Sequence, residues 1–370
     1  MNTSVNSVDT NSPAYRIADL ARWAPSGDNM QTWAFEIAAP DHLVVHAHDT
    51  RDHCVYDRDG HPSQIAFGAL LETIAIAATG LGLRAEITRR PTAAAPANGA
   101  EPLRLQFDAR FVPEPGLAPD PLIAAIEKRT VQRRPMRTRP LTDEHKRILQ
   151  AAVGDGYELA WIEGSGPKWK AARLMFDNAR LRLTMPEAFE THRSIIDWNA
   201  WESTHRVPDR ALGVDPGTLK LMKWAMGSWG RMSVVNTLMG TWAPRLQMDL
   251  VPGLACAAHF VLKARSKPQT IDDYIAAGRA LQRFWLSMTN LGLYMQPEMT
   301  PLIFSKYVRE NDDRFTAKPG LWEYARKLER QTAQLVFTDA LHPVYMGRLG
   351  YGPAPKARSK RKPLTELLVN

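Results

Sequence analysis

An internal repeat constrains the fold of this chain more than any other feature of its sequence. Two segments match without a gap, Gly-Ala-Leu-Leu-Glu-Thr-Ile-Ala-Ile-Ala-Ala-Thr-Gly-Leu-Gly-Leu at 68–83 and Gly-Arg-Ala-Leu-Gln-Arg-Phe-Trp-Leu-Ser-Met-Thr-Asn-Leu-Gly-Leu at 278–293. Each ends in Leu-Gly-Leu, which is typical of a helix that stops at a glycine and passes into a strand. We interpret the pair as a duplicated α+β unit, with chance matching of common residues as the alternative. Such units usually pack as a pseudo-two-fold pair with a ligand site at the junction.

The second informative feature is a polar turn between a helical pattern that ends at Ala24 and a strand pattern over 33–37. The turn reads Pro25-Ser26-Gly27-Asp28-Asn29, with Gln31 close behind and tryptophans on both sides. Amide and hydroxyl groups beside aromatic rings can hold a planar ligand that has a polar edge. An ordinary Asx-turn is the simpler alternative. The weaker counterpart at 153–163 lacks the serine and the asparagine.

Length and composition indicate a cytoplasmic protein with a substantial core. The chain has 370 residues, 44% of them apolar, which suits about two domains or one large one. No apolar run reaches the ~18 residues of a membrane-spanning helix. The first residues lack the basic and apolar regions of a secretory signal. Two cysteines are too few for a disulfide framework or a cysteine-rich zinc site.

The net charge of +8 comes partly from a basic tail in which five cations fall within 356–362. A nucleic-acid partner is not expected, because no zinc-finger, RNP or recognition-helix pattern accompanies the charge. His46 and His48 would share one face of a strand and precede several carboxylates and histidines in 49–61. That segment lacks a recognised ligand spacing, so a solvated loop is favoured and no metal site is predicted.

Composition divides the chain into a tail, two halves and a linker. We expect a disordered tail over 1–12, a first half over 13–112, a proline-rich linker over 113–121 and a second half over 122–370. The second half would include a tryptophan-rich helical insertion at 186–250 and a basic arm at 343–370. Helices are expected over 15–24, 62–83, 122–128, 169–183, 271–291 and 343–350, and another after the N-cap Thr142. Strands are expected over 32–38, 43–47, 84–89, 103–109, 158–163 and 334–338.

The turn also resembles a known signature. Ala-Pro-Ser-Gly-Asp-Asn-Met-Gln-Thr-Trp at 24–33 is similar to the A-P-S-x-x-N-x-Q-P-W motif of the nitroreductase superfamily of FMN enzymes, in its single-chain duplicated, Acg-like branch. Arg-Thr-Val-Gln-Arg-Arg-Pro-Met at 129–136 resembles the arginine-rich phosphate segment of that branch, and the segments at 291–293, 348–352 and 360–364 also fit. The resemblance covers roughly 15–367 and fits least over 186–250. Departures are Thr32 in place of proline and Thr-Val-Gln at 130–132.

This resemblance implies an α+β, nitroreductase-like fold in which two tandem half-domains form an intramolecular pseudo-dimer with a helical lid insertion. FMN would lie at the junction, one per chain. The residues that the resemblance places at its phosphate are Arg129, Gln132, Arg133, Lys360 and Arg361, with Arg134 as a second register. Those placed at its ring and ribityl chain are Pro25, Ser26, Asn29, Gln31, Gln296 and Pro297.

The implied activity is that of an oxidoreductase. Electrons would pass from a reduced nicotinamide, NAD(P)H, or from another donor through flavin N5 to a small aromatic or conjugated acceptor. Trp198 and Trp201 are the candidate substrate contacts and His192 and His205 the candidate proton donors, whereas a purely structural tryptophan and methionine core is the alternative. Storage of FMN without turnover, or consumption of the flavin, are competing functions. The expected partner is a small-molecule substrate and not a membrane, with a monomer or a homodimer as the assembly.

Overall fold

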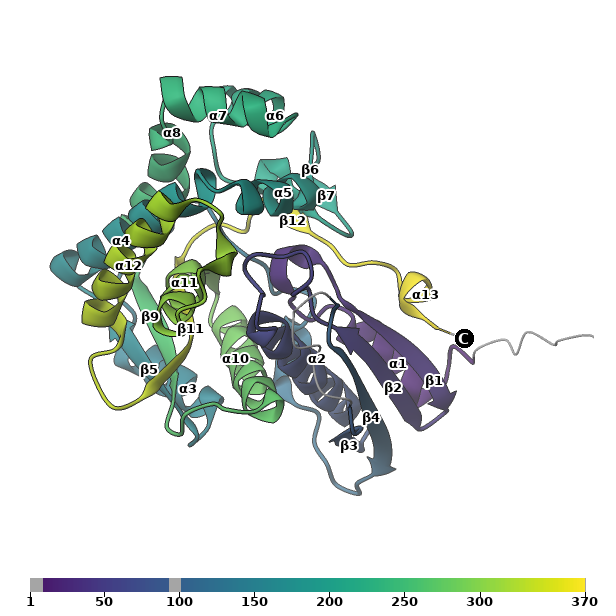
Figure 1. The fold of residues 1–370 in the computed structure, drawn as a ribbon. Coiled ribbons are helices and arrows are strands. Elements are labelled where there is room, and N and C mark those ends of the chain that lie inside the picture. Colours follow the sequence, from purple (N-terminus) through teal and green to yellow (C-terminus); the bar gives the residue numbers. More distant parts are fainter. Residues whose placement is uncertain (1–8, 93–100, 370) are drawn as a thin grey trace, which may run out of the picture.

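The computed structural model describes residues 9–92 and 101–369, which form two antiparallel four-stranded sheets on either side of two long helices (Figure 1). The helices are α1 (Pro13–Ala21), α2 (His61–Thr79), α3 (Asp143–Val153), α4 (Ser165–Leu183), α5 (Pro186–Ile195), α6 (Pro216–Ala225), α7 (Trp229–Leu238), α8 (Trp242–Arg245), α9 (Val251–Leu254), α10 (Ile271–Asn290), α11 (Thr300–Arg309), α12 (Pro319–Val336) and α13 (Leu364–Leu367). The strands are β1 (Trp33–Ala39), β2 (His42–His48), β3 (Leu83–Arg89), β4 (Arg104–Pro113), β5 (Tyr157–Ile162), β6 (Ile196–Asp197), β7 (Glu202–Ser203), β8 (Val207–Pro208), β9 (Ala258–Ala264), β10 (Leu293–Pro297), β11 (His342–Tyr351) and β12 (Arg358–Ser359).

The two large sheets have the same topology. In the first half the strand order is β1-β2-β4-β3, and α2 connects β2 to β3. In the second half the order is β5-β9-β11-β10, and α10 connects β9 to β10. When β1 is matched with β5 and α2 with α10, both halves show the succession of helix, strands and Leu-Gly-Leu turn that the repeat predicts.

Helices α2 and α10 cross at matched glycines in the centre of the molecule (Figure 1). A Cβ atom on Gly68 would overlap the carbonyl oxygen of Ile275, and one on Gly278 would overlap that of Ile65. The contact is therefore reciprocal, and glycine at both positions allows the two backbones to approach closely. Among the described residues, α2 is the one helix long and apolar enough to cross a membrane, but 78% of its apolar window is buried within the fold.

The insertion between α4 and β9 is only partly helical. The short strands β6, β7 and β8 all lie between α5 and α6, helices α7 to α9 follow, and the segment lies beyond one end of the two sheets (Figure 1). Strand β7 pairs with β12 of the C-terminal tail. The tail, yellow in Figure 1, then crosses to the first half, where Leu364 and Leu367 enter the core beside β1. Insertion and tail thus connect the two halves.

Several predicted elements are confirmed and others are wrong. Thr142 caps α3, since its Oγ accepts a hydrogen bond from the backbone N–H of His145. The strand expected at 334–338 is instead the end of α12, whose buried residues follow helical spacing. The helix expected at 343–350 is strand β11, and strand β9 was not predicted. The helix expected at 122–128 is a short 3-10 turn over Pro121–Ala125.

The two errors at strands β9 and β11 have one physical cause. Strands β9 and β11 are central in their sheet and buried on both faces, so their sequences lack the alternation that marks a half-exposed strand.

Of the tail expected over 1–12, residues 1–8 lie outside the described residues. Ser12 is ordered, because its Oγ caps α1 by accepting a hydrogen bond from the N–H of Tyr15.

Candidate functional site

The polar turn after α1 has a strained backbone. Asp28, Asn29 and Gln31 adopt the left-handed conformation, with φ angles of 50°, 63° and 51°. Non-glycine residues rarely hold such angles, and they persist only where surrounding contacts fix them. Clusters of this strain occur preferentially at ligand sites, so the backbone itself marks the turn as a candidate site.

The side chains of the turn hold three parts of the chain together. The amide of Gln31 donates to the carbonyl of Thr204 at 2.7 Å and accepts from the N–H of Lys362 at 2.9 Å. The amide of Asn29 donates to the carbonyl of Arg206 at 3.1 Å and accepts from Arg361 at 2.8 Å. Both amides, predicted from the sequence to meet a ligand, therefore fix the insertion and the tail against the turn.

Four arginines gather behind this turn, around Trp23. We call Arg22, Arg129, Arg358 and Arg361 the arginine cluster. Arg129 donates to the carbonyl of Trp23 at 3.0 Å and lies 4.6 Å from the ring centroid of Trp285, and Arg361 donates to the carbonyl of Ala24 at 2.9 Å. The structure thus brings together two of the predicted phosphate residues, which lie far apart in the sequence.

Two members of the arginine cluster, Arg129 and Arg361, are buried without a matching negative charge, whereas Arg22 pairs with Asp19 at 2.7 Å. Burial, followed by repulsion from Arg358, lowers the pKa of Arg129 to about 9. Burial and then repulsion from Arg129 also lower the pKa of Arg361 well below its usual range. Within residues 9–92 and 101–369, no carboxylate forms an ion pair with Arg129 or Arg361, and the Nε atoms of Arg129 and Arg358 are buried without a partner. Because buried charges are normally paired, this cluster suits an anionic ligand.

The segment that carries Arg129 continues along the edge of the second sheet. The N–H of Gln132 donates to the carbonyl of Met295 on β10 at 2.9 Å, and Arg348 on β11 donates to the carbonyl of Arg133 at 2.8 Å. Arg133 lies close enough to Asp28 for the arginine to lower the pKa of that carboxyl, although burial has the larger, raising effect. The arginine cluster, the strained turn and strand β10 are therefore one continuous site.

Two buried polar atoms beside β10 lack partners within the described residues. They are Oε1 of Gln296 and Nη1 of Arg348, and these two residues face each other in the register of β10 and β11. One is a hydrogen-bond acceptor and the other a donor. Arg348 is also held 3.5 Å from Glu298, which in turn accepts a hydrogen bond from His259 at 2.7 Å. This edge of the sheet therefore presents one hydrogen-bond donor, on Arg348, and one acceptor, on Gln296.

The other predicted cofactor residues have structural partners of their own. The amide of Gln132 donates to the carbonyl of Pro353, and the side chain of Arg134 is exposed. Lys360 pairs with Glu202 at 3.2 Å. Pro25 is buried next to Ser26, whose Oγ accepts a hydrogen bond from the N–H of Gln31, and Pro297 ends β10.

The four candidate substrate residues occupy different environments. Trp198 packs within the insertion's own hydrophobic clusters, whereas Trp201 is 55% exposed. His205 is exposed and follows Thr204, which contacts the turn. His192 is bonded to Tyr56 at 2.9 Å, and burial, then Arg182, lowers the pKa of His192 to about 3. His192 is therefore neutral near pH 7.

Sequence reasoning missed several residues of this site. The sequence places Arg358 only in a basic tail and Arg348 only in a motif, because nothing in it shows which cations become buried. It indicates Asp28 only as a turn residue. The signal that could have found these residues is the concentration of arginine in segments that also contain small and apolar residues, such as 348–361.

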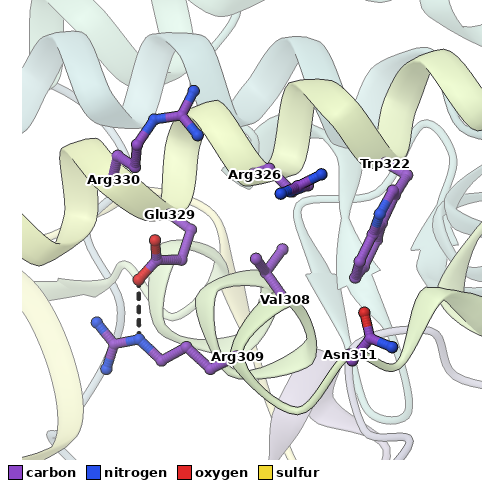
Figure 2. A pocket seen from close by; sticks show the side chains of 7 residues that line it. All are labelled: Val308, Arg309, Asn311, Trp322, Arg326, Glu329 and Arg330. Carbon is purple, nitrogen blue, oxygen red and sulfur yellow. Dashed lines mark hydrogen bonds and ion pairs between the residues drawn. The ribbon is translucent and has the colours of Figure 1, made fainter.

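Two surface pockets lie outside this site. One, of about 400 Å³, lies between α11 and α12, where Arg309 bonds to Glu329 at 2.8 Å beside Trp322, Arg326 and Arg330 (Figure 2). The other, of about 350 Å³, lies between α3 and α10. In the part of the chain that the structure describes, no three His, Cys, Asp or Glu side chains group closely enough to hold a metal ion.

Comparisons with known proteins give low similarities. No family model matches the chain. An uncharacterized protein of Mycobacterium tuberculosis (strain CDC 1551 / Oshkosh) is 24% identical over 357 residues, which are 94% of this chain and 47% of the relative. The chain thus spans about half the length of that relative.

Two solved structures are also similar. One is a nitroreductase-like family protein from Bacillus cereus, with a TM-score of 0.34 and 12% identity, covering 68% of this chain and 96% of the other. The second is the FMN-dependent nitroreductase NfnB from Mycobacterium smegmatis in complex with NADPH, with a TM-score of 0.33 and 15% identity, covering 66% and 96%.

Proposed function

We propose that this chain is an FMN-dependent oxidoreductase of the nitroreductase type. The observation that carries the proposal is the arginine cluster, in which Arg129 and Arg361 are buried without an acidic partner. The phosphate of FMN is a dianion, and guanidinium groups bind phosphate oxygens through paired hydrogen bonds. The motif-like turn at 24–33, which meets this cluster, supports FMN over other phosphorylated ligands.

The unpartnered groups also fit the rest of FMN. Arg129, Arg358 and Arg361 would hold the phosphate. The imide edge of an isoalloxazine ring carries both acceptors and a donor, which suits Nη1 of Arg348 and Oε1 of Gln296. When bound, FMN would supply hydride and electron transfer between NAD(P)H or another donor and a small conjugated acceptor, while the protein sets its orientation and access.

The arrangement of the halves supports the proposed pseudo-dimer. The matched strand orders and the reciprocal contact of Gly68 with Gly278 are expected of two duplicated halves related by an approximate two-fold axis. The turn comes from the first half, whereas the segment 129–133 and β10 come from the second. A site at such a junction needs both halves. The insertion, which bonds to the turn through Thr204 and Arg206, is placed to act as the lid.

For proton delivery we favour His205 over His192 within this proposal. The ring of His205 is exposed on the segment that contacts the turn, whereas His192 is neutral and bonded to Tyr56. A general acid must hold a proton that it can donate, which His192, with its pKa lowered to about 3, does not near pH 7.

Storage of FMN without turnover is the second candidate function. It is favoured by the closed arrangement over the turn, where β7 pairs with β12 and the backbone at 204–206 accepts hydrogen bonds from Asn29 and Gln31. Reduction of the bound flavin by NADH or NADPH under anaerobic conditions separates the two functions, because a storage protein would leave the flavin oxidised.

Arg129→Gln tests the proposal, and exposed Arg330→Gln is the matched control. We expect the change to weaken FMN binding by about 30-fold or more, as when one partner of a buried charge pair is lost at ~2–5 kcal/mol. The uncompensated charge of Arg129 disfavours the folded state. Its removal should therefore leave the free energy of unfolding of the FMN-free protein unchanged or raise it. Fluorescence titration of FMN and thermal unfolding of the free protein measure the two effects.

A purely structural role for Arg129 predicts the opposite pair of results. The free variant would then lose stability through its lost bonds to Trp23 and Trp285, and its FMN affinity would be unchanged. A wild-type chain that binds no FMN would overturn the proposal.

A further inference from the structure

Five of the eleven large apolar side chains that the described part of the chain exposes lie on or between the outer helices of the insertion, α6 to α8. Leu238 is 79% exposed, Met239 63%, Trp242 58%, Val234 52% and Trp224 51%. We call these five residues the α6–α8 patch. Helices α6 and α7 lie at the end of the molecule farthest from the two sheets (Figure 1). The patch is therefore separate from the site at the turn.

Three residues of this region lie on one face of α7. Arg231, Val234 and Leu238 are spaced at three and seven residues, so they share a helix face. The guanidinium of Arg231 lies 5.4 Å from the ring centroid of Trp224 on α6, which joins the two helices into one surface. Leu238 leads through Met239 directly to Trp242 at the start of α8. Apolar area exposed in this continuous way marks an interaction surface.

The charges carried by helices α6 to α8 themselves have one sign, and the exposed carboxylate Asp215 directly precedes α6 as its N-cap. Between Pro216 and Met248 the sequence contains Lys220, Lys223, Arg231 and Arg245 but neither aspartate nor glutamate. The first three are exposed, whereas Arg245 is buried against Phe176. A second copy of the chain docking through this patch would place like charges opposite each other, which disfavours self-association. The pattern suits a partner that is apolar and negatively charged.

We propose that the α6–α8 patch docks onto the surface of an anionic lipid bilayer. Exposed tryptophan and leucine would enter the boundary between headgroups and acyl chains, and the lysines would meet anionic headgroups. This proposal needs no membrane-spanning helix and does not depend on FMN binding. It differs from the expectation from the sequence that a membrane is not a partner, and vesicle binding decides between the two.

Co-sedimentation of the full chain with vesicles tests this proposal. Vesicles of phosphatidylcholine with about a third phosphatidylserine should bind the chain, pure phosphatidylcholine should bind it weakly, and added salt should release it. Leu238→Glu and the double variant Lys220→Glu/Lys223→Glu should each lower partitioning about tenfold. Matched exposed controls away from the patch, Val112→Glu and Lys267→Glu, should bind as the wild type does.

Several results would overturn the proposal. These are failure of the wild-type chain to bind anionic vesicles, equal binding to neutral vesicles, or unchanged binding of both patch variants. A dimer that forms without lipid and dissociates in Leu238→Glu would assign the patch to self-association instead. Thermal unfolding of each variant confirms that its fold is retained, which is expected because the substituted side chains are exposed.

Discussion

At the scale of single residues, His259 forms a buried ion pair with Glu298 that stabilises the second sheet beside the site. Its Nδ1 faces the carboxylate of Glu298 at 2.7 Å, and its Nε2 faces the carbonyl of Gly253 at 2.8 Å. Both neighbours are acceptors, so both ring nitrogens must donate and the imidazole must be protonated. Burial alone would lower the pKa of His259, but the adjacent Glu298 raises it above its ordinary value. Glu298 also lies beside Arg348 and so helps to position it.

This pair predicts a pH-dependent stability. Because folding raises the pKa of His259, the stabilisation is complete below about pH 6.5 and declines as the pH rises further. Glu298→Gln should therefore lower the free energy of unfolding by about 3 kcal/mol near pH 6, with a smaller loss near pH 9. Urea unfolding at both pH values measures the difference.

The control is Glu310→Gln, which removes an exposed ion pair with Lys306 and should cost at most ~0.5 kcal/mol. A loss for Glu298→Gln that is the same at both pH values would show that His259 is not protonated by its partner.

How far single residues could be predicted depended on whether their role was local. The turn residues and Arg129 were identified because their motifs are contiguous in the sequence. That Asn29 and Gln31 would bond to the insertion and the tail could not be foreseen, since the partners lie at 204–206 and 361–362. Contacts with residues distant in the sequence likewise distinguish half-buried Arg358, in the arginine cluster, from exposed Arg134.

At the scale of elements, the crossing of α2 and α10 depends on two glycines. Replacing glycine by alanine in a helix usually stabilises it by up to ~1 kcal/mol. Here Gly68→Ala should instead destabilise the chain by about 1–3 kcal/mol, because the new Cβ would overlap the backbone of α10 at Ile275. Gly278→Ala should cost a similar amount. Urea unfolding of both variants measures these changes.

Gly320→Ala is the matched control, since a Cβ there meets nothing within 4 Å. The double variant at Gly68 and Gly278 should cost less than the sum of the single changes, because one helix displacement relieves both overlaps. Stabilisation by either single change would show that the helices are not in close contact.

Long elements that carry a repeated end signal were predictable from the sequence, whereas short apolar runs were not. The repeat located α2 and α10 because it combines length, apolar content and a shared Leu-Gly-Leu end. The end of α12 was mistaken for a strand because Leu-Val-Phe at 335–337 is a short apolar run, and the length of the preceding amphipathic helix was overlooked.

At the scale of the whole molecule, the matched halves differ in their electrostatics. The second-half counterpart of the turn lies at Gly154–Gly156, beside a pocket that Arg279 and Arg283 line. Both of these arginines pair with Glu72, at 2.8 and 2.7 Å, and Arg283 also pairs with Asp120. Arg129 and Arg361 have no such ion pairs among the described residues. Of the two junctions between the halves, the first, at the turn 25–29, therefore leaves unpaired positive charge for a ligand, whereas the second, at Gly154–Gly156, does not.

We therefore predict one FMN per chain rather than the two that a symmetric pseudo-dimer would bind. The flavin absorbance of purified, FMN-saturated protein, compared with its peptide concentration, measures the ratio. Glu72→Gln removes the counter-ion of Arg279 and Arg283. It therefore tests whether neutralisation of these two arginines is what prevents the second junction from binding FMN. If the wild-type ratio is near two, charge compensation does not decide which junction binds FMN, and the two halves must offer equivalent sites despite their different turns.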